Sequence, residues 1–453
     1  MGLFDKLRGG SDDRVVFLGI DGVPYELITD HPDVFENLHA VAEEGTSGRI
    51  ESIVPPESSA CWPSLTTGQN PGKTGVYGFQ DRERGSYDTY VPMGSHVEAT
   101  RLWDLVTEDG RDATVLNVPV TFPPSNRIQR QVSGFLSPSI EKAASNDDVR
   151  RTLERYDYAI DADAKLGHDD DKTAFIENAH DTLAARRKVF EHYVDEDDWD
   201  LFFGVFMTPD RVNHFLFGDY ATDGEYAAEF LEFYRELDAV IGAIREKLDD
   251  DTELVVASDH GFTREEYEVN LNRWLEEQGW LSYDADAGDE PDELADIADD
   301  ARAYSLIPGR LFLNLEGREP RGGIPEGDYE TVRDELIADL ESLEGPDGRA
   351  VCDRIVTGED AFDGDYADIA PDLVIIPADG FDLKAGFGSE KDVFSTGPRN
   401  GMHKFGNASL FTTDADVTIG DDVNLFDVAP TILDQLDVDA DRSAFDGESL
   451  RAD

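Results

Sequence analysis

The stretch RVVFLGIDG, residues 14–22, decides the fold class, because it joins an apolar run of strand length to an Asp-Gly turn. A short apolar run bounded by a turn signal is typical of a strand buried inside a sheet. In open α/β sheets, ligands bind outside the carboxyl ends of such strands. We therefore expect a buried strand at Arg14–Ile20 that ends by presenting Asp21 to a binding site.

Runs of β-branched and aromatic residues alternate with segments of helical period along the rest of the chain. Helices are predicted at Glu98–Glu108 and along the apolar positions from Phe230 to Leu248. Further strands are predicted at Ala113–Val118, Leu201–Met207, Glu253–Ala257 and Leu373–Ile376. This alternation predicts an α/β fold, namely a doubly wound, mostly parallel sheet with helices on both faces.

A change in composition marks a predicted insertion. Tyr283–Arg302 is rich in Asp, Ala and Gly, and a compact strand-helix-strand unit follows it. We expect residues 303–369 to form a small inserted α+β cap, because Ala370–Pro377 is typical of a core strand. The catalytic core would then comprise residues 14–283 and 370–450, with residues 1–13 as a flexible N-terminus.

The 453-residue chain is strongly acidic, with 100 Asp and Glu against 39 Lys and Arg and a formal charge of −61. This charge disfavours binding to a nucleic-acid polymer. It fits either a solvated halophilic surface of archaeal type or a store of cations. We favour the halophilic surface, because the acidic residues fall mostly on predicted loops and outer helix faces.

The two cysteines, Cys61 and Cys352, are too few for a disulfide framework and favour a reducing compartment. The N-terminal segment does not have the pattern of a signal peptide, and no apolar run reaches the length of a membrane span. We therefore expect a cytoplasmic protein in a high-salt cytosol. The oligomeric state is not predicted.

Six Asp and His residues lie where metal ligands are expected in such a fold. Asp210 and His214 are four residues apart and share one face of a helical turn, and His403 lies in a predicted glycine-flanked loop. Singly, such an Asp is more often a helix N-cap and such a His a surface or core residue. Together they favour a two-metal site, since carboxylates and imidazoles suit Zn²⁺ or Mn²⁺. The six residues are Asp21, Asp210, His214, Asp259, His260 and His403.

The order of these motifs resembles the alkaline phosphatase superfamily, and within it the type I phosphodiesterase and nucleotide pyrophosphatase family. Asp21 is followed by TGQNPGK, DRVNH, SDHG and GMH, and the resemblance extends to NLFDVAPTIL at 424–433. It implies an alkaline phosphatase-like fold and a phosphoric ester hydrolase that uses two divalent ions, with Zn²⁺ as first choice and Mn²⁺ as second. The implied partner is a small phosphate-ester substrate.

The resemblance also implies a nucleophile. In the phosphodiesterases the nucleophile lies ten residues before the Gly of the Thr-Gly pair, and counting back from Gly68 leads to Ser58. Ser58 would form a phosphoseryl intermediate. One ion would be held by Asp21, Asp259 and His260, and the other by Asp210, His214 and His403.

The chain departs from the nucleotide pyrophosphatases in three ways. Phe79 stands where they place a phosphate-binding Asn, Thr74 stands where they have a His before Gly75, and the nucleophile candidate is Ser where diesterases more often use Thr. Tyr77 and Phe79 are candidates for stacking a base or another apolar leaving group, although packing of their loop against the cap explains them equally well. We expect cleavage of phosphodiester or pyrophosphate bonds. The alternatives are a phosphomonoesterase or phosphotransferase of the same superfamily, and a noncatalytic cytosolic metal-binding protein on the same fold.

Overall fold

The computed structural model describes residues 13–196, 198–284, 293–388 and 392–452. Apart from Asp13, the predicted flexible N-terminus at residues 1–13 lies outside these ranges. In the described part of the chain, none of the helices combines the length and the apolar character needed to cross a membrane.

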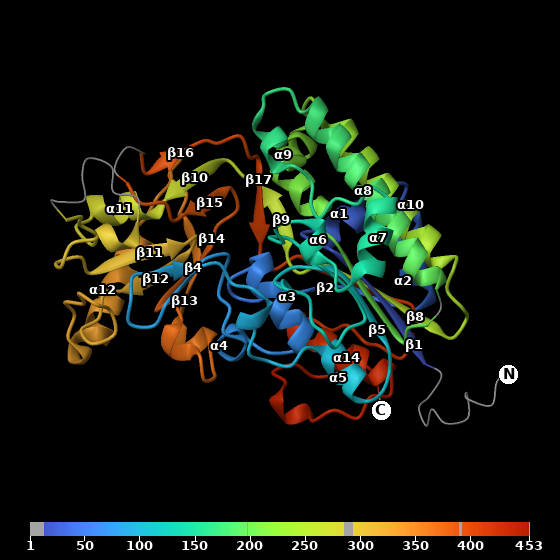
Figure 1. Cartoon of the computed structure of the whole chain (residues 1–453). Coiled ribbons are helices and arrows are strands. Elements are labelled where there is room, and N and C mark those ends of the chain that lie inside the picture. The colour runs from blue at the N-terminus through green and yellow to red at the C-terminus, as the bar shows by residue number, and fades with distance from the viewer. Residues whose placement is uncertain (1–12, 197, 285–292, 389–391, 453) are drawn as a thin grey trace.

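A seven-stranded sheet forms the centre of the larger lobe (Figure 1). Its strand order is β2 (Thr46–Ile50), β18 (Ala408–Thr412), β8 (Thr252–Ala257), β1 (Arg14–Ile20), β7 (Leu201–Phe206), β5 (Ala113–Val118) and β6 (Arg130–Ser133). The strands from β8 to β6 run parallel, whereas β18 is antiparallel to both of its neighbours. Ile20 of β1 lies beside Phe206 of β7, and Gly19 beside Ala257 of β8. The three strands therefore end together.

Helices cover both faces of this sheet, which confirms the predicted doubly wound α/β architecture. Val16, Leu18 and Ile20 of β1 pack into one core, with helices α2, α8, α9 and α10, whereas Val15 and Phe17 pack into the other, with helices α3, α5 and α14. The bounds are α2 (Glu36–Glu44), α8 (Thr173–Asp195), α9 (Thr208–Thr222), α10 (Ala227–Arg245), α3 (Ser58–Thr67), α5 (Leu102–Glu108) and α14 (Val428–Gln435). The shorter helices are α1 (Tyr25–Asp30), α4 (Pro71–Thr74), α6 (Ile140–Ala143) and α7 (Asp147–Arg155).

A second lobe has its own core and two small sheets. The four-stranded sheet has the order β11 (Ala303–Ile307), β12 (Arg310–Leu313), β14 (Leu373–Pro377) and β13 (Cys352–Thr357). The three-stranded sheet has the order β15 (Phe381–Lys384), β10 (Tyr267–Asn270) and β16 (Phe394–Ser395). The helices of this lobe are α11 (Leu271–Glu277), α12 (Tyr329–Glu341) and α13 (Gly358–Ala361). The remaining strands form two two-stranded sheets. In one, β9 (Gly261–Arg264) pairs with β17 (Gly401–Lys404), and in the other, β3 (Asp81–Arg82) pairs with β4 (Thr89–Tyr90).

Three predictions of local structure need correction. Leu373–Ile376 is a strand, but β14 lies in the second lobe between β12 and β13, so the expected return to the core at residue 370 is wrong. A buried apolar run is equally compatible with either sheet. His403 lies in β17 and not in a loop, because Gly401–Lys404 pairs with β9. The helix predicted from Glu98 begins at Leu102.

Trp62 of α3 fixes that helix against the central strand. A Cβ added to Gly19 of β1 would lie 2.3 Å from Cη2 of the Trp62 ring and 2.9 Å from Cγ2 of Val205. The indole is fully buried and meets Phe17 edge to face, with ring centroids 6.4 Å apart. Glycine at position 19 therefore lets α3 dock closely on β1, near the strand end that carries Asp21.

We expect Gly19→Ala to lower the free energy of unfolding by about 1–3 kcal/mol, because the added methyl group overpacks a rigid contact between ring and strand. Urea denaturation followed by circular dichroism measures the loss. Gly327→Ala is the matched control, since nothing lies within 4 Å of a Cβ at that position. Equal unfolding midpoints for the two variants would contradict the close-docking interpretation.

Candidate active site

The parallel register of β1 with β7 and β8 places the first three candidate ligands at one end of the sheet. Asp21 follows β1 directly, and its backbone N–H donates to the carbonyl of Phe206 at 3.0 Å. Asp259 and His260 follow β8, where Oδ1 of Asp259 accepts from the backbone N–H of Gly22 at 3.2 Å. All three side chains are fully buried. Two neighbouring strand ends therefore place two carboxylates and one imidazole in contact range of each other.

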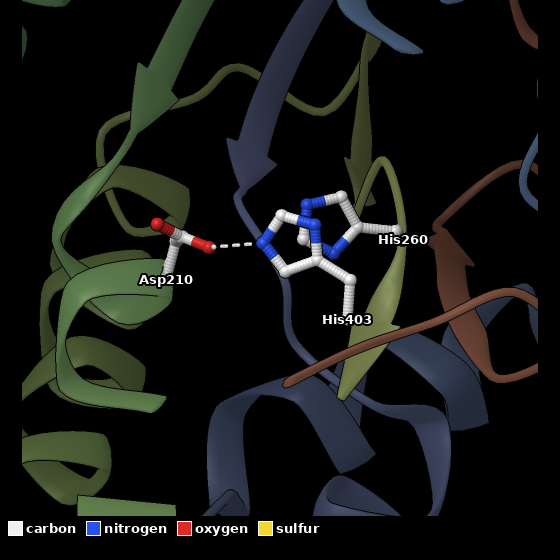
Figure 2. A group of neighbouring side chains, drawn as sticks. All are labelled: Asp210, His260 and His403. Carbon is white, nitrogen blue, oxygen red and sulfur yellow. Dashed lines mark hydrogen bonds and ion pairs between the residues drawn. The ribbon is translucent and has the colours of Figure 1, made fainter. Parts of the chain in front are cut away.

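Helix α9 and strand β17 supply the other three candidates. Oδ1 of Asp210 lies 3.5 Å from Nε2 of His214, as their four-residue spacing predicted, and 3.2 Å from Nε2 of His403 (Figure 2). The Nε2 atoms of His214 and His403 are 3.2 Å apart. The structure therefore brings all six predicted metal-site residues to one end of the sheet.

The three imidazoles are held by the same kind of hydrogen bond. Each Nδ1 donates to a backbone carbonyl, at 3.1 Å from His214 to Gly401, 3.1 Å from His260 to Gly261 and 2.9 Å from His403 to Pro56. Because a carbonyl oxygen only accepts, these bonds leave the Nε2 lone pairs turned inward. Histidines that bind metals are oriented by the same kind of bond at the distal ring nitrogen.

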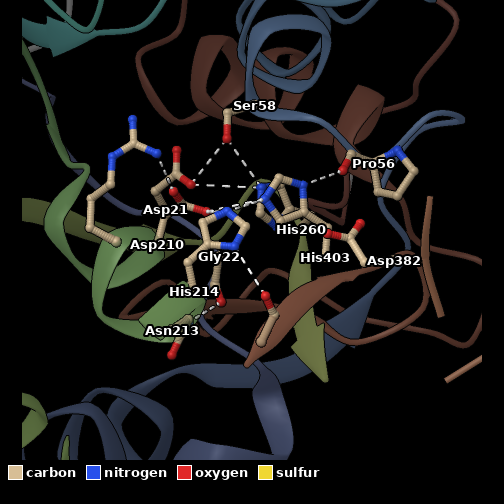
Figure 3. Close-up of polar contacts among 12 residues, drawn as sticks. Asp21, Gly22, Pro56, Ser58, Asp210, Asn213, His214, His260, Asp382 and His403 are labelled. Atoms are coloured by element: carbon tan, nitrogen blue, oxygen red, sulfur yellow. Dashed lines mark hydrogen bonds and ion pairs between the residues drawn. The ribbon is translucent and has the colours of Figure 1, made fainter. Parts of the chain in front are cut away.

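Ser58 lies above these ligands as the first residue of α3 (Figure 3). Its Oγ is 3.2 Å from Oδ1 of Asp21 and 3.1 Å from Nε2 of His260. Oδ2 of Asp21 accepts from Nε1 of Trp62 at 2.7 Å, which fixes the carboxylate. The hydroxyl thus points into the ligand cluster, and Ser59, the next residue, has a buried Oγ without a hydrogen-bond partner in the described chain.

The donor sets fit divalent metal ions. Donor atoms of Asp21, Asp259 and His260 lie within 4.8 Å of one another, and so do those of Asp210, His260 and His403. His260 belongs to both groups, whereas the resemblance assigned it to one. Oδ2 of Asp259 is buried and has no hydrogen-bond partner in the described residues, so it is available to a cation. Mixed carboxylate and imidazole donors suit Zn²⁺ or Mn²⁺.

Burial shifts the pKa values of Asp21, Asp259 and His260 in the directions expected for ligands that no cation neutralises. Burial, followed by repulsion from Asp259 and Asp210, raises the pKa of Asp21 well above its usual value. Burial raises the pKa of Asp259 to about 7 and lowers that of His260 to about 3. Both directions reflect charge that is costly in a water-poor site. A bound cation would offset that cost for the carboxylates.

A cavity of about 340 Å³ opens onto Ser58 between the two lobes. Phe79 and Phe135 form one wall, with rings edge to face at 5.5 Å and 86°. Tyr77 does not reach this cavity: its hydroxyl donates to the carbonyl of Tyr366 at 2.7 Å, and its ring packs on Phe362. Of the two candidate substrate residues, the structure therefore places Phe79 at the cavity and Tyr77 in the packing between lobes.

Glu57, directly before Ser58, links the start of α3 to the second lobe. Its carboxylate accepts from the backbone N–H of Phe79 at 3.1 Å and pairs with Nη1 of Arg310 at 2.5 Å. The Arg310 side chain is fully buried and that of Glu57 is 12% exposed. Neither residue was predicted, because the pair joins segments more than two hundred residues apart. The position of Glu57 next to the nucleophile candidate was the one signal available.

Comparison with known proteins agrees with this geometry. The sequence model of the family described as type I phosphodiesterase / nucleotide pyrophosphatase matches residues 15–405. A search of curated proteins finds no match. Among solved structures, phosphonoacetate hydrolase from Sinorhizobium meliloti 1021 in complex with phosphonoformate superposes with a TM-score of 0.61 at 15% identity, covering 95% of this chain and 97% of its own.

Two further structures have the same fold. Human ectonucleotide pyrophosphatase / phosphodiesterase 5 gives a TM-score of 0.57 at 12% identity, with 96% of this chain and 97% of that chain covered. Wild-type alkaline phosphatase PafA gives 0.58 at 12% identity, with 97% and 99% covered. At these identities the likeness shows the fold, which is alkaline phosphatase-like as predicted.

Arg310→Met should lower the free energy of unfolding by about 3–5 kcal/mol, because it leaves the Glu57 carboxylate buried without its partner. The double variant Glu57→Gln/Arg310→Met should recover a large part of the lost stability, since the amide oxygen of Gln can still accept from the backbone N–H of Phe79. Arg49→Met, in an exposed pair with Glu26, is the control and should change stability by about 0.5 kcal/mol or less. Chemical unfolding of the four proteins tests this, and equal losses in the single and double variants would contradict it.

Proposed function

Because this chain belongs to the type I phosphodiesterase / nucleotide pyrophosphatase family, a family of phosphoric ester hydrolases, we propose that it cleaves a phosphodiester or pyrophosphate bond by attack of Ser58. The observation that carries the proposal is the position of the Ser58 hydroxyl, 3.1 Å from Nε2 of His260 and 3.2 Å from Oδ1 of Asp21. Both atoms belong to residues proposed to hold one of the two ions, and such an ion would supply the positive charge that eases deprotonation of the hydroxyl without a separate base.

Two divalent ions complete the proposed site. Asp21, Asp259 and His260 would hold one, and Asp210, His214 and His403 the other, with His260 close to both groups. Zn²⁺ is the first choice and Mn²⁺ the second. When bound, such ions supply Lewis-acid stabilisation of phosphoryl charge and ease deprotonation of a hydroxyl.

The residues of the chain do the positioning. Trp62 holds Asp21 in place through its indole N–H, so that Oδ1 of Asp21 faces Ser58. Ser58 begins α3, and the positive end of a helix dipole favours an anionic phosphoryl group there. Attack by Oγ forms the bond from serine to phosphorus while the bond to the leaving oxygen breaks. Water then hydrolyses the phosphoseryl intermediate and restores the serine.

The aromatic wall favours a diester over a monoester. Phe79 and Phe135 offer an apolar surface beside Ser58, which suits an esterified substituent better than the extra oxygen charge of a monoester. A phosphomonoesterase or phosphotransferase of the same superfamily would keep the same ligands and is the second candidate. A noncatalytic metal-binding protein would bind the ions without turning over either class of ester.

We also propose a cellular environment for this protein. The chain has 100 acidic and 39 basic residues, and this acidic surplus supports a protein of haloarchaeal type that works in a cytoplasm of high salt concentration. The same charge makes a small phosphate ester a more suitable partner than a nucleic-acid polymer.

Ser58→Ala should reduce turnover on the order of a thousandfold or more, as loss of a nucleophile does, and leave metal content unchanged. Ser59→Ala is the matched control, because it removes the same atom one residue away and should keep full activity. The assay compares bis(4-nitrophenyl) phosphate with 4-nitrophenyl phosphate in high KCl. Retained turnover in Ser58→Ala would refute the assignment, and preference for the monoester would favour the second candidate.

Metal analysis after purification in high salt should find two divalent ions per chain. Prolonged dialysis against a chelator should abolish hydrolysis, and added Zn²⁺ or Mn²⁺ should restore it. His403→Ala should retain about one ion, because the other donor group does not use His403. Full activity of the metal-free protein would rule out the proposed chemistry.

A further inference from the structure

Four Lys and Arg side chains line the cavity in the described part of the chain, and three of them already have carboxylate partners. Arg211 pairs with Asp210 at 2.8 Å and with Asp161 at 2.9 Å. Arg310 pairs with Glu57 at 2.5 Å. Lys384 pairs closely with Asp382 and lies 3.6 Å from Glu268. These three cations are therefore neutralised from within the protein.

Arg399 is the fourth cation and differs from the others. It is half-buried and lines the cavity, yet it has no hydrogen bond or ion pair within the residues that the structure describes. Its N–H donors are therefore available to an anion that enters the cavity.

The backbone beside Arg399 is held in place. The N–H of Asn400 donates to the carbonyl of His214 at 2.8 Å, and its side chain bridges the N–H of Gly218 and Oδ2 of Asp219. The next residue, Gly401, begins β17 and accepts from Nδ1 of His214. Arg399 is thus fixed to helix α9 next to the ligand cluster.

The Arg399 side chain lines the same cavity as Ser58, His214 and His403. An uncompensated positive charge therefore stands beside the proposed reaction centre.

We propose that Arg399 binds a second anionic group, a carboxylate or a phosphate, that the substrate carries in addition to the phosphoryl group attacked by Ser58. This inference rests on the proposed function and deepens it, by assigning the substrate to phosphate esters with an additional negative charge. The planar fork of the guanidinium matches either anion with two parallel hydrogen bonds. Aromatic and cationic walls then recognise different parts of one substrate.

Binding to the metal-loaded Ser58→Ala protein tests the site without turnover. Isothermal titration calorimetry compares methylphosphonate with methylenediphosphonate and 3-phosphonopropionate, which add a second phosphonate or a carboxylate. One of the doubly anionic probes should bind roughly tenfold to a hundredfold more tightly than methylphosphonate, as expected for a charged hydrogen bond. The tighter probe identifies the second group.

Adding Arg399→Ala should remove this preference, and Arg399→Lys should keep part of it. Arg127→Ala is the control, because it removes the same charge from an exposed pair with Glu108 outside the cavity, and it should leave the preference intact. The proposal is overturned if the starting protein shows no preference or if the preference survives Arg399→Ala.

Turnover gives an independent readout with wild-type Ser58. Two diesters are compared, 4-nitrophenyl phenyl phosphate and its analogue with a carboxylate on the phenyl ring. Arg399→Ala should lower kcat/KM roughly tenfold or more for the diester that carries the carboxylate and roughly twofold or less for the one without it. Equal losses would overturn the proposal. If neither diester is cleaved while the Arg399-dependent binding preference holds, the proposed function fails and the anion site stands.

Discussion

The structure depends on one constraint, the alignment of parallel strands that end together at a single edge of the sheet. The register of β1 with β7 and β8 places Asp21, the start of α9 and the Asp259-His260 pair at the same level. Carboxylates that are buried together repel one another and lose their hydration, and a rigid scaffold keeps them in contact. The sheet core around β1 supplies that rigidity, because the strand is buried on both faces.

Ser58 is fixed by a second layer of contacts around α3. Trp62 packs on Gly19 of β1 and at the same time donates its N–H to Asp21, so one side chain sets both the position of the helix and the orientation of a ligand. Glu57, at the start of the same helix, reaches Arg310 in the other lobe. Contacts with both lobes of the molecule therefore fix the position of the Ser58 hydroxyl.

Local sequence patterns predicted many strands and helices of the core, but not the contacts between segments that are far apart in the sequence. The bounds of β1 and β5 agree with prediction, and the spacing of Asp210 and His214 was enough to place both on one helical face. The motif order then predicted which six residues the structure brings together. The sheet to which β14 belongs could not be predicted, because hydrophobicity reports burial and not the identity of the neighbouring strand. Arg310 and Arg399 were missed for a similar reason, since the importance of a lone arginine depends on what it faces.

The division of the cavity between two separately packed cores has a consequence for how such a protein diversifies. The ligand cluster comes from strand ends of the large sheet, helix α9 and strand β17, whereas Arg310, Ile375 and Lys384 reach the cavity from the second lobe. Substitutions in that lobe can reshape which molecules are admitted while the reaction centre keeps its framework. Part of the cavity wall can in this sense change independently of the ligand cluster, and the two lobes meet at the glutamate that precedes the serine.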